Sequence, residues 1–318
     1  MSGAVRRVFT EMVAVDVVSW SGLVVAHVRA GELEYARCVF DDMPIRDVVS
    51  WTAMISGYSQ AKRSTEALEL FWEMVDAKVV PDEVTMLSVV SVCANLGDLE
   101  TGIATHQYIE DNGFGGMIFL GNALIDMYSK CGCLNRAWQV FNIMNRRSLV
   151  TWNSMILACA NHGDPDHVFH LYECMTTSGF LPDGFTFLAL LVAYKHKGLV
   201  DEGCRVFESM QRDYGIEARI EHYRCTVEML GRAGRLEEAY RLITSMSIPS
   251  NYVIWEALLA ACRVHSNVDM GERVVEKLLM LKPERDYHAI LRHIYAAAVE
   301  KEEVKEIMQT TMVNSVNF

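Results

Sequence analysis

The sequence predicts an all-α protein, an α-solenoid of tandem helix-turn-helix repeats. Four tryptophans lie in near-copies of one phrase: VVSWSGLV at Trp20, VVSWTAMI at Trp51, LVTWNSMI at Trp152 and YVIWEALL at Trp255. A second phrase, Gly followed after four residues by Ala or Gly, recurs between them, and an aromatic-x-x-Met phrase closes most copies. Self-similarity at a period near 35 residues is typical of solenoids, in which each repeat packs mainly against its neighbours.

Aligning these phrases divides the chain into units whose lengths cycle through 31, 35 and 35–36 residues, with 32 in the last full repeat. Residues 1–16 match only the second half of a unit. The chain is therefore expected to begin inside a repeat, without a targeting peptide. The predicted units are 17–47, 48–82, 83–117, 118–148, 149–183, 184–219, 220–251, 252–285 and 286–318.

Unit 48–82 shows why each repeat is expected to be a helical hairpin. Apolar residues recur at three- and four-residue spacing on both sides of a break at Ala61–Ser64, which is the helical pattern. Two antiparallel helices of about a dozen residues, each about 18 Å long, follow. Glycine at the break in most units suits a left-handed helix end, although this unit has Lys62. Small residues let the paired helices approach closely: Ala36, Ala67, Ala137 and Ala239.

The predicted architecture is a right-handed superhelix similar to that of tetratricopeptide arrays. A tetratricopeptide array itself is disfavoured, because its period is constant and its W-x-x-L-G-x-x-Y phrase is absent here. The chain contains no run of about 18 apolar residues, so no membrane association is expected.

The formal net charge of −12 opposes nucleic-acid binding, unless charge is segregated between the faces of the solenoid.

No motif for catalysis or metal binding is found, so neither enzymatic activity nor a cofactor is expected. A zinc deaminase requires His-x-Glu and Cys-x-x-Cys phrases, and both are absent, as are a P-loop and HExxH. Three histidines, His162, His167 and His170, cluster near Asp164 and Asp166. That cluster is interpreted as a solvated turn and helix start.

The units resemble pentatricopeptide repeats, specifically the plant subclass in which P, L and S motifs alternate. Units 48–82 and 149–183 resemble P motifs, 83–117 and 184–219 resemble L motifs, and 17–47 and 118–148 resemble S motifs. Residues 220–251, with IEHYRCTVEMLGRAGRLEEAYRLITSM, resemble the terminal S motif. Residues 252–285 resemble the first E motif, and 286–318 resemble the second only loosely.

This resemblance implies binding of single-stranded RNA in a mitochondrion or chloroplast. Most members of the subclass specify sites of C-to-U editing, and some carry a deaminase domain that has no counterpart in this sequence. The resemblance therefore implies a deaminase, or an editing accessory protein, recruited in trans through the E motifs. Two alternatives stay open: a role in RNA stability, splicing or translation, and a protein–protein scaffold, which the acidic charge favours.

The resemblance also implies that the fifth and last residues of a unit read one base. Hydroxyl, amide and carboxylate groups there offer different donors and acceptors to a base edge. The expected RNA is G-G-x-(C/U)-U, read from the first unit to the fifth. The implied base-reading pairs are Ser21 with Asp47, Thr52 with Asp82, Asn122 with Ser148, and Asn153 with Asp183.

Three other units depart from this pattern. The two L-like units offer Leu87 with Met117 and Leu188 with Arg219, which implies weak reading, and Arg224 replaces the small polar residue in the terminal S-like unit. Helix capping is a competing explanation for the last-residue aspartates, since Asp is a good N-cap. The tryptophans beside the fifth positions are interpreted as core between repeats, and base stacking by them is the alternative.

Overall fold

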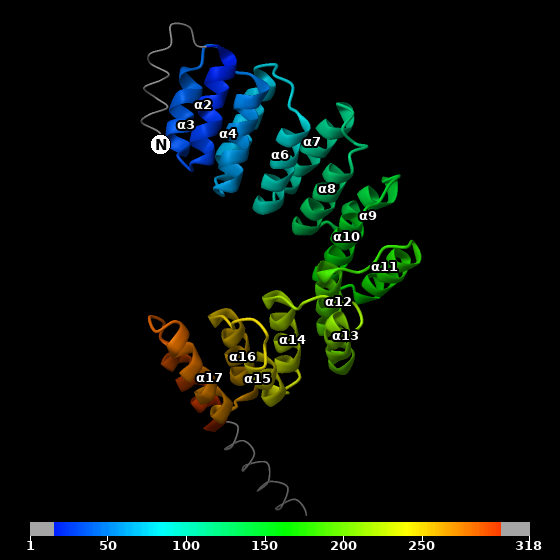
Figure 1. Cartoon of the computed structure of the whole chain (residues 1–318), viewed down its shortest axis with the longest axis vertical. Helices are drawn as coiled ribbons and strands as arrows, with labels where there is room; N and C mark the ends of the chain where they lie inside the picture. Colours follow the sequence, from blue (N-terminus) through cyan, green and yellow to red (C-terminus); the bar gives the residue numbers. More distant parts are fainter. Residues whose placement is uncertain (1–15, 300–318) are drawn as a thin grey trace, which may run out of the picture. The chain divides into compact units, whose positions relative to one another are not determined.

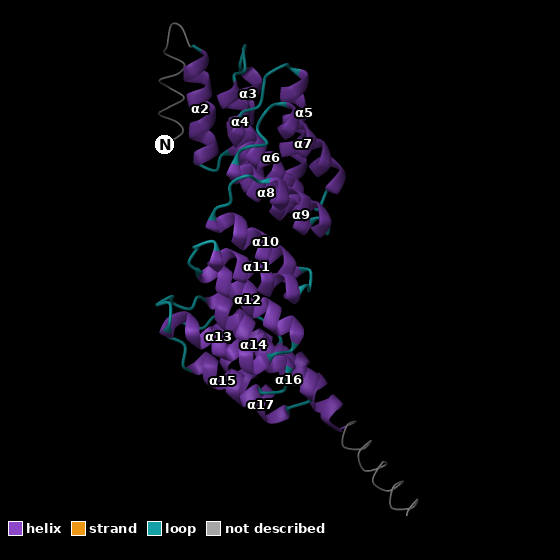
Figure 2. Cartoon of the chain, turned by 90° about the vertical axis from the view of Figure 1, so that its right-hand side faces the viewer, coloured by secondary structure: helices purple, strands orange, loops and turns teal. Residues whose placement is uncertain are grey.

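The computed structural model describes residues 16–299, and this part of the chain is helical throughout, with no strand (Figure 2). The partial repeat expected at 1–16 lies outside the described residues except for Asp16, as does 300–318 of the last predicted unit. The first eight helices are α2 (Val17–Arg29), α3 (Leu33–Asp42), α4 (Val48–Gln60), α5 (Ser64–Asp76), α6 (Glu83–Leu96), α7 (Leu99–Asp111), α8 (Ile118–Lys130) and α9 (Leu134–Ile143). The next eight are α10 (Leu149–Asn161), α11 (Pro165–Thr177), α12 (Gly184–Lys197), α13 (Val200–Arg212), α14 (Ile220–Arg232), α15 (Leu236–Thr244), α16 (Tyr252–His265) and α17 (Val268–Leu281).

Within each of two compact units the helices form hairpins that stack on their neighbours, which confirms the predicted all-α solenoid (Figure 1). Among the described residues, the boundary between the two units lies between Ala158 and Cys159. In the first, the first helices of successive hairpins contact each other in the order α2, α4, α6 and α8, and each also contacts its own second helix. In the second, α12, α14 and α16 make the same chain of contacts and pair with α13, α15 and α17.

The turn inside each hairpin has the left-handed residue that the sequence predicted. Gly97 and Gly198 end α6 and α12 with φ of 68° and 69°. Lys62, which replaces glycine after α4, also has a φ of 60°. A left-handed non-glycine residue costs roughly 1–2 kcal/mol. The turn between α4 and α5 therefore keeps the left-handed geometry without glycine, at some cost in the stability of the fold.

Small residues bring the helices together as expected, since Ala36, Ala67, Ala137 and Ala239 are all completely buried. The two L-like units use glycine instead. A Cβ atom at Gly203 would lie only 2.5 Å from Met229 of α14, so the methionine side chain occupies the space that glycine leaves. Packing between successive repeats thus favours glycine at this position, because a larger residue would require the methionine side chain to move.

Trp51 and Trp152 belong to the core between repeats, as interpreted from the sequence, whereas Trp20 is only half-buried. Trp51 and Trp152 are 2% and 6% exposed. Trp51 meets the Phe40 ring edge-on, with 4.7 Å between centroids, and the Arg46 guanidinium lies 4.7 Å from the centre of the same phenyl ring. Arg46 also donates to the Phe40 carbonyl. These contacts join the end of α3 to the start of α4, so Trp51 is not available for base stacking.

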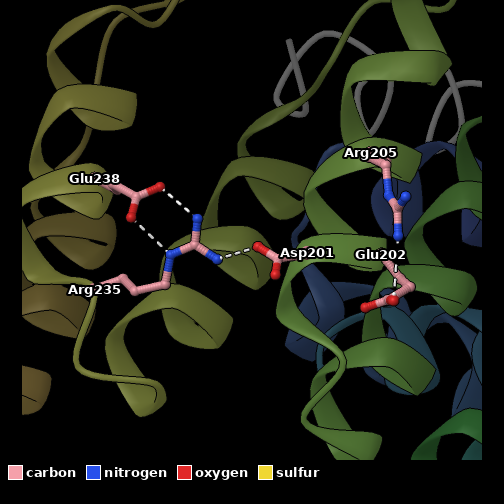
Figure 3. Close-up of polar contacts among 5 residues, drawn as sticks. All are labelled: Asp201, Glu202, Arg205, Arg235 and Glu238. Atoms are coloured by element: carbon pink, nitrogen blue, oxygen red, sulfur yellow. Dashed lines mark hydrogen bonds and ion pairs between the residues drawn. The ribbon is translucent and has the colours of Figure 1, made fainter.

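Ion pairs link successive second helices. Arg235, just before α15, donates to Glu238 at 2.6 and 2.7 Å and to Asp201 of α13 at 2.5 Å (Figure 3). In the other compact unit Arg63 makes the equivalent contacts, with Glu66 of α5 and Glu34 of α3.

Across residues 16–299, no helix is both long and apolar enough to cross a membrane.

Candidate nucleic-acid interface

In the predicted units up to residue 251, the last residue lies at the N-cap position of the next first helix. Asp47 Oδ1 accepts the Ser50 N–H at 2.9 Å, Asp82 Oδ1 accepts the Thr85 N–H at 2.8 Å, and Asp183 Oδ1 accepts the Thr186 N–H at 3.0 Å. Ser148 Oγ accepts the Thr151 N–H at 3.2 Å. Capping therefore accounts for the residue type at these positions, as the competing explanation required.

The structure brings Ser21 and Asp47 together. The Ser21 hydroxyl lies 2.7 Å from Asp47 Oδ1 and 2.9 Å from the Val17 carbonyl oxygen. Ser21 is buried, and Asp47 is half-buried. A contact between residues 26 positions apart, across two successive first helices, places a hydroxyl and a carboxylate side by side.

Thr52 and Asp82 lie in the same arrangement, but a third side chain joins them. Thr52 Oγ1 is 3.3 Å from Asp82 Oδ1 and only 2.6 Å from Thr85 Oγ1. Thr85, buried in the first turn of α6, also donates to Asp82 Oδ1 at 2.8 Å. Reasoning from the sequence missed Thr85, and the signal for it was its place three residues after an N-cap, where a threonine hydroxyl reaches the cap.

Both carboxylates divide their two oxygens in the same way. The contacts of Asp47 and Asp82 with the helix N-terminus and with the fifth-residue hydroxyl all involve Oδ1. No donor among residues 16–299 bonds Oδ2 of either carboxylate. One oxygen of each therefore holds the side chain in place while the other keeps its acceptor capacity.

The third predicted pair is not joined by a hydrogen bond. Asn122 Oδ1 is buried without a hydrogen-bond partner among the described residues. Ser148 instead exchanges hydrogen bonds with Thr151, whose Oγ1 accepts the Ser148 N–H at 3.0 Å. A buried amide oxygen that lacks a donor costs on the order of 1–3 kcal/mol, so Asn122 is poised to accept one.

The two members of the fourth predicted pair belong to different compact units. Asn153 lies on α10 and is 8% exposed, and Asp183 caps α12. The last residues of the two L-like units, Met117 and Arg219, differ from the capping aspartates in their local contacts. Met117 and Arg219 make no side-chain hydrogen bond to the helices that they precede, α8 and α14. The Arg219 guanidinium instead lies 5.6 Å from the centre of the Phe185 ring.

A row of exposed apolar side chains runs beside the predicted reading residues. We name Val18, Val49, Val84 and Phe119 the apolar row; each is the second residue of its first helix. Residues three apart share a helix face, so each lies beside the fifth residue of the same helix. The same position in later first helices holds Val150, Phe185 and Val253, and all seven side chains are between 39% and 75% exposed. Only Glu221 of α14 interrupts this pattern within residues 16–299.

The histidine cluster behaves as the turn and helix start that the sequence indicated. Asp164 caps α11 by accepting the His167 N–H at 3.3 Å, and its other oxygen lies 2.6 Å from His167 Nδ1. Both side chains are partly exposed. This pairing is explained by the helix end alone.

Stacked helical hairpins that repeat these positions with few exceptions place the chain among helical repeat proteins. The family model described as PPR repeat family matches residues 46–95 and 147–196, and the model described as PPR repeat matches 18–48, 122–149 and 185–214. The chain belongs to the pentatricopeptide repeat family. A maize pentatricopeptide repeat protein, PPR10, has a similar fold, with a TM-score of 0.59 at 23% identity over 98% of this chain and 47% of that one.

Several curated relatives are proteins of Arabidopsis thaliana. One pentatricopeptide repeat-containing protein is 41% identical over 297 residues, covering 92% of this chain and 56% of the relative. A mitochondrial one is 39% identical over 293 residues, covering 92% and 47%, and a chloroplastic one is 40% identical over 287 residues, covering 89% and 39%. The chain thus spans about half the length of the curated relatives it matches.

Proposed function

We propose that this chain binds single-stranded RNA and reads one base with the fifth and last residues of a repeat. The observation that carries the proposal is the pairing of Ser21 with Asp47 and of Thr52 with Asp82. In each pair the N-cap fixes one carboxylate oxygen, and the other oxygen keeps its acceptor capacity. The hydroxyl can donate or accept. Such a pair complements guanine, which offers both N–H donors and a carbonyl acceptor on one edge.

The apolar row supplies the second requirement for binding a single strand. Bases that leave a stack need an apolar surface against their faces, and stacking on a protein side chain is tolerant of sequence. Val49 and Phe119 are partly exposed beside the polar pairs. A base held between neighbouring members of the row would present its edge to the fifth and last residues.

Selection from a random pool of single-stranded RNA tests this proposal. The purified chain is expected to enrich G-G-x-(C/U)-U, with the fourth and fifth letters read by Asn122 with Ser148 and by Asn153 with Asp183. Absence of any enrichment, at low as well as moderate salt, would refute sequence-specific RNA binding and favour a protein scaffold.

A substitution at Thr52 tests the assignment of readers. Thr52→Asn is expected to shift the second specified base from guanine towards uracil, because an amide replaces the hydroxyl beside Asp82. Ser56→Asn, one turn further along α4, is the matched control and should leave the preference unchanged. If both variants select the same RNA as the unmodified chain, Thr52 does not read a base.

We further propose that the protein is an organellar specificity factor for C-to-U RNA editing, with P, L and S repeats followed by E motifs from residue 252 onwards. The deaminase, or an accessory protein, would be recruited by the E motifs. Relatives with mitochondrial and chloroplastic names support an organellar location. Sequencing of mitochondrial and chloroplast transcripts from a loss-of-function plant tests this role. Loss of one or more C-to-U changes is expected, and altered transcript ends or splicing with intact editing would indicate the alternative role in RNA processing.

A further inference from the structure

Two first helices carry a cluster of three charged side chains. Glu228 of α14 accepts a hydrogen bond from Lys195 Nζ of α12, with 2.8 Å between Nζ and Oε2, and its Oε1 accepts from Arg224 of α14. The side chains of Lys195 and Glu228 are 13% and 25% exposed. Both oxygens of one carboxylate are thus occupied by different cations, and the cluster has a net charge of +1.

The cluster lies on the helix face that carries the reading positions. Arg224 is the fifth residue of its first helix, the position that Ser21 and Thr52 occupy in α2 and α4. Glu228 follows four residues later, so it lies on the same face. Lys195 lies seven residues, about two turns, after the fifth residue of α12, and α12 contacts α14 directly. Arg224 therefore faces the proposed RNA but is held by a carboxylate.

Cations are scarce on the first helices. Among α2, α4, α6, α8, α10, α12, α14 and α16, the lysines and arginines are Arg29, Lys130, Lys195, Lys197, Arg224, Arg232 and Arg263. Four of these seven are ion-paired: Lys130 with Asp126, Lys197 with Asp166, and both Lys195 and Arg224 with Glu228. Glu228 is distinctive because it binds two cations on adjacent first helices, one of which is at a reading position.

We propose that Lys195 and Arg224 form a binding site for an RNA backbone phosphate, and that Glu228 is a built-in competitor that occupies this site in the absence of RNA. The proposal rests on the proposed RNA-binding function. A guanidinium and an ammonium are the groups that proteins use for phosphates, the first as a fork and the second as a point charge. A phosphate must displace Glu228, so much of the attraction of the two cations is already used within the protein.

Replacing Glu228 with glutamine is the direct test. Glu228→Gln removes the competing charge and should raise the affinity for a mixed-sequence single-stranded RNA several-fold at low salt. The dependence of log K on log salt should steepen by roughly 0.7 for each further phosphate neutralised. Glu237→Gln is the matched control, because it removes the same charge from an ion pair with Arg273 that joins the second helices α15 and α17. The control should bind RNA as the unmodified chain does.

A second pair of variants assigns the gain to the cluster. Adding Arg224→Gln to Glu228→Gln should abolish the gain. Glu228→Asp keeps the net charge but is too short to hold both cations at once, so it should give a smaller gain, and it serves as the test if the glutamine variant does not fold. A titration with inorganic phosphate at constant ionic strength should not displace RNA from the glutamine variant, and efficient displacement would indicate a site for a free anion.

The outcomes separate this inference from the proposed function. If the unmodified chain binds RNA while Glu228→Gln and Glu237→Gln bind equally well, there is no masked phosphate site and the RNA-binding function stands. If no variant binds RNA at any salt concentration, the proposed function itself is wrong.

Discussion

The hairpins that begin with α2 and α4 differ from those that begin with α12 and α14 in how they use a carboxylate. Asp47 holds the N-terminus of α4 and the Ser21 hydroxyl with Oδ1 alone, so Oδ2 is left to accept a donor. Glu228 has both oxygens engaged by Lys195 and Arg224. The groups that donate hydrogen bonds to a carboxylate therefore determine its role. A carboxylate with one oxygen left over is suited to the proposed base recognition, whereas one held by two cations neutralises them.

This difference bears on the acidic net charge. A net charge of −12 gives no long-range attraction for RNA. In the α2 and α4 hairpins, base recognition would depend on short-range hydrogen bonds and apolar contacts, which are weakly affected by salt. In the α12 and α14 hairpins, RNA binding would depend on charges and would therefore be sensitive to salt. Three experiments test this difference between the two pairs of hairpins.

The largest expected effect is on the apolar row. Phe119→Ala should weaken RNA binding by about 1–3 kcal/mol, the range measured for loss of one base-stacking side chain. Trp72→Ala on α5, which removes a similarly exposed aromatic side chain from a second helix, is the control. Fluorescence anisotropy with a labelled G-G-x-(C/U)-U RNA measures both affinities. Equal losses for the two variants would mean that the row has no special part in binding.

A smaller effect is expected at Asp47, where the observed helix cap coincides with the proposed base reading. Asp47→Ala should cost about 1 kcal/mol of stability through loss of the cap, and it should also abolish the preference for guanine at the first specified base. Asp98→Ala removes the cap of the second helix α7, so it should cost similar stability and leave selectivity intact. Urea denaturation and competition binding measure the two effects. A change in selectivity with Asp98→Ala would show that destabilisation alone explains the result.

The smallest effect concerns pH and the cluster of α12 and α14. Burial tends to raise the pKa of Glu228, but hydrogen bonds and charges from Lys195 and Arg224 outweigh it and lower the pKa below its ordinary value. The carboxylate therefore contributes its full stability above the pKa of an unfolded glutamate, about 4.3, and loses it as the pH falls through the lower folded pKa.

The difference in unfolding free energy between the unmodified chain and Glu228→Gln should accordingly be constant from pH 5 to pH 7 and shrink below about pH 4. Urea denaturation at several pH values measures it. A difference that does not change down to pH 3 would show that Glu228 retains no pH-dependent pairing with the two cations.

Much of the fold could be predicted because the same local features recur in successive repeats: an apolar helical stripe, a break between two helices and a small residue in the second helix. The helical stripe around Trp51, the break near Lys62 and the small residue Ala67 all appear as predicted. The N-cap position of Asp47 was predictable for the same reason, because capping is a local property of four consecutive residues.

The exposed row and the charged cluster were not predicted. In a chain with 51% apolar residues, a valine in the first turn of an apolar helix looks the same whether it is buried or exposed. Exposure of Val49 depends on which side the neighbouring hairpins cover, which is a property of the packing. Lys195 and Glu228 are 33 residues apart, and only the contact between α12 and α14 brings them together.

Under the proposed function the last residue of a unit would both cap a helix and read a base, and this double role would limit how the protein can change its target. Residues at this N-cap position are mostly of the few types that cap well, among them Asp, Asn and Ser, although Met117 and Arg219 are exceptions. The chain uses these at Asp47, Asp82, Ser148, Asp183 and Asn251. Retargeting by mutation is therefore easier at the fifth residue, whose side chain carries no such duty. Under the proposed function, the requirements for starting a helix would thus restrict which bases these repeats can recognise.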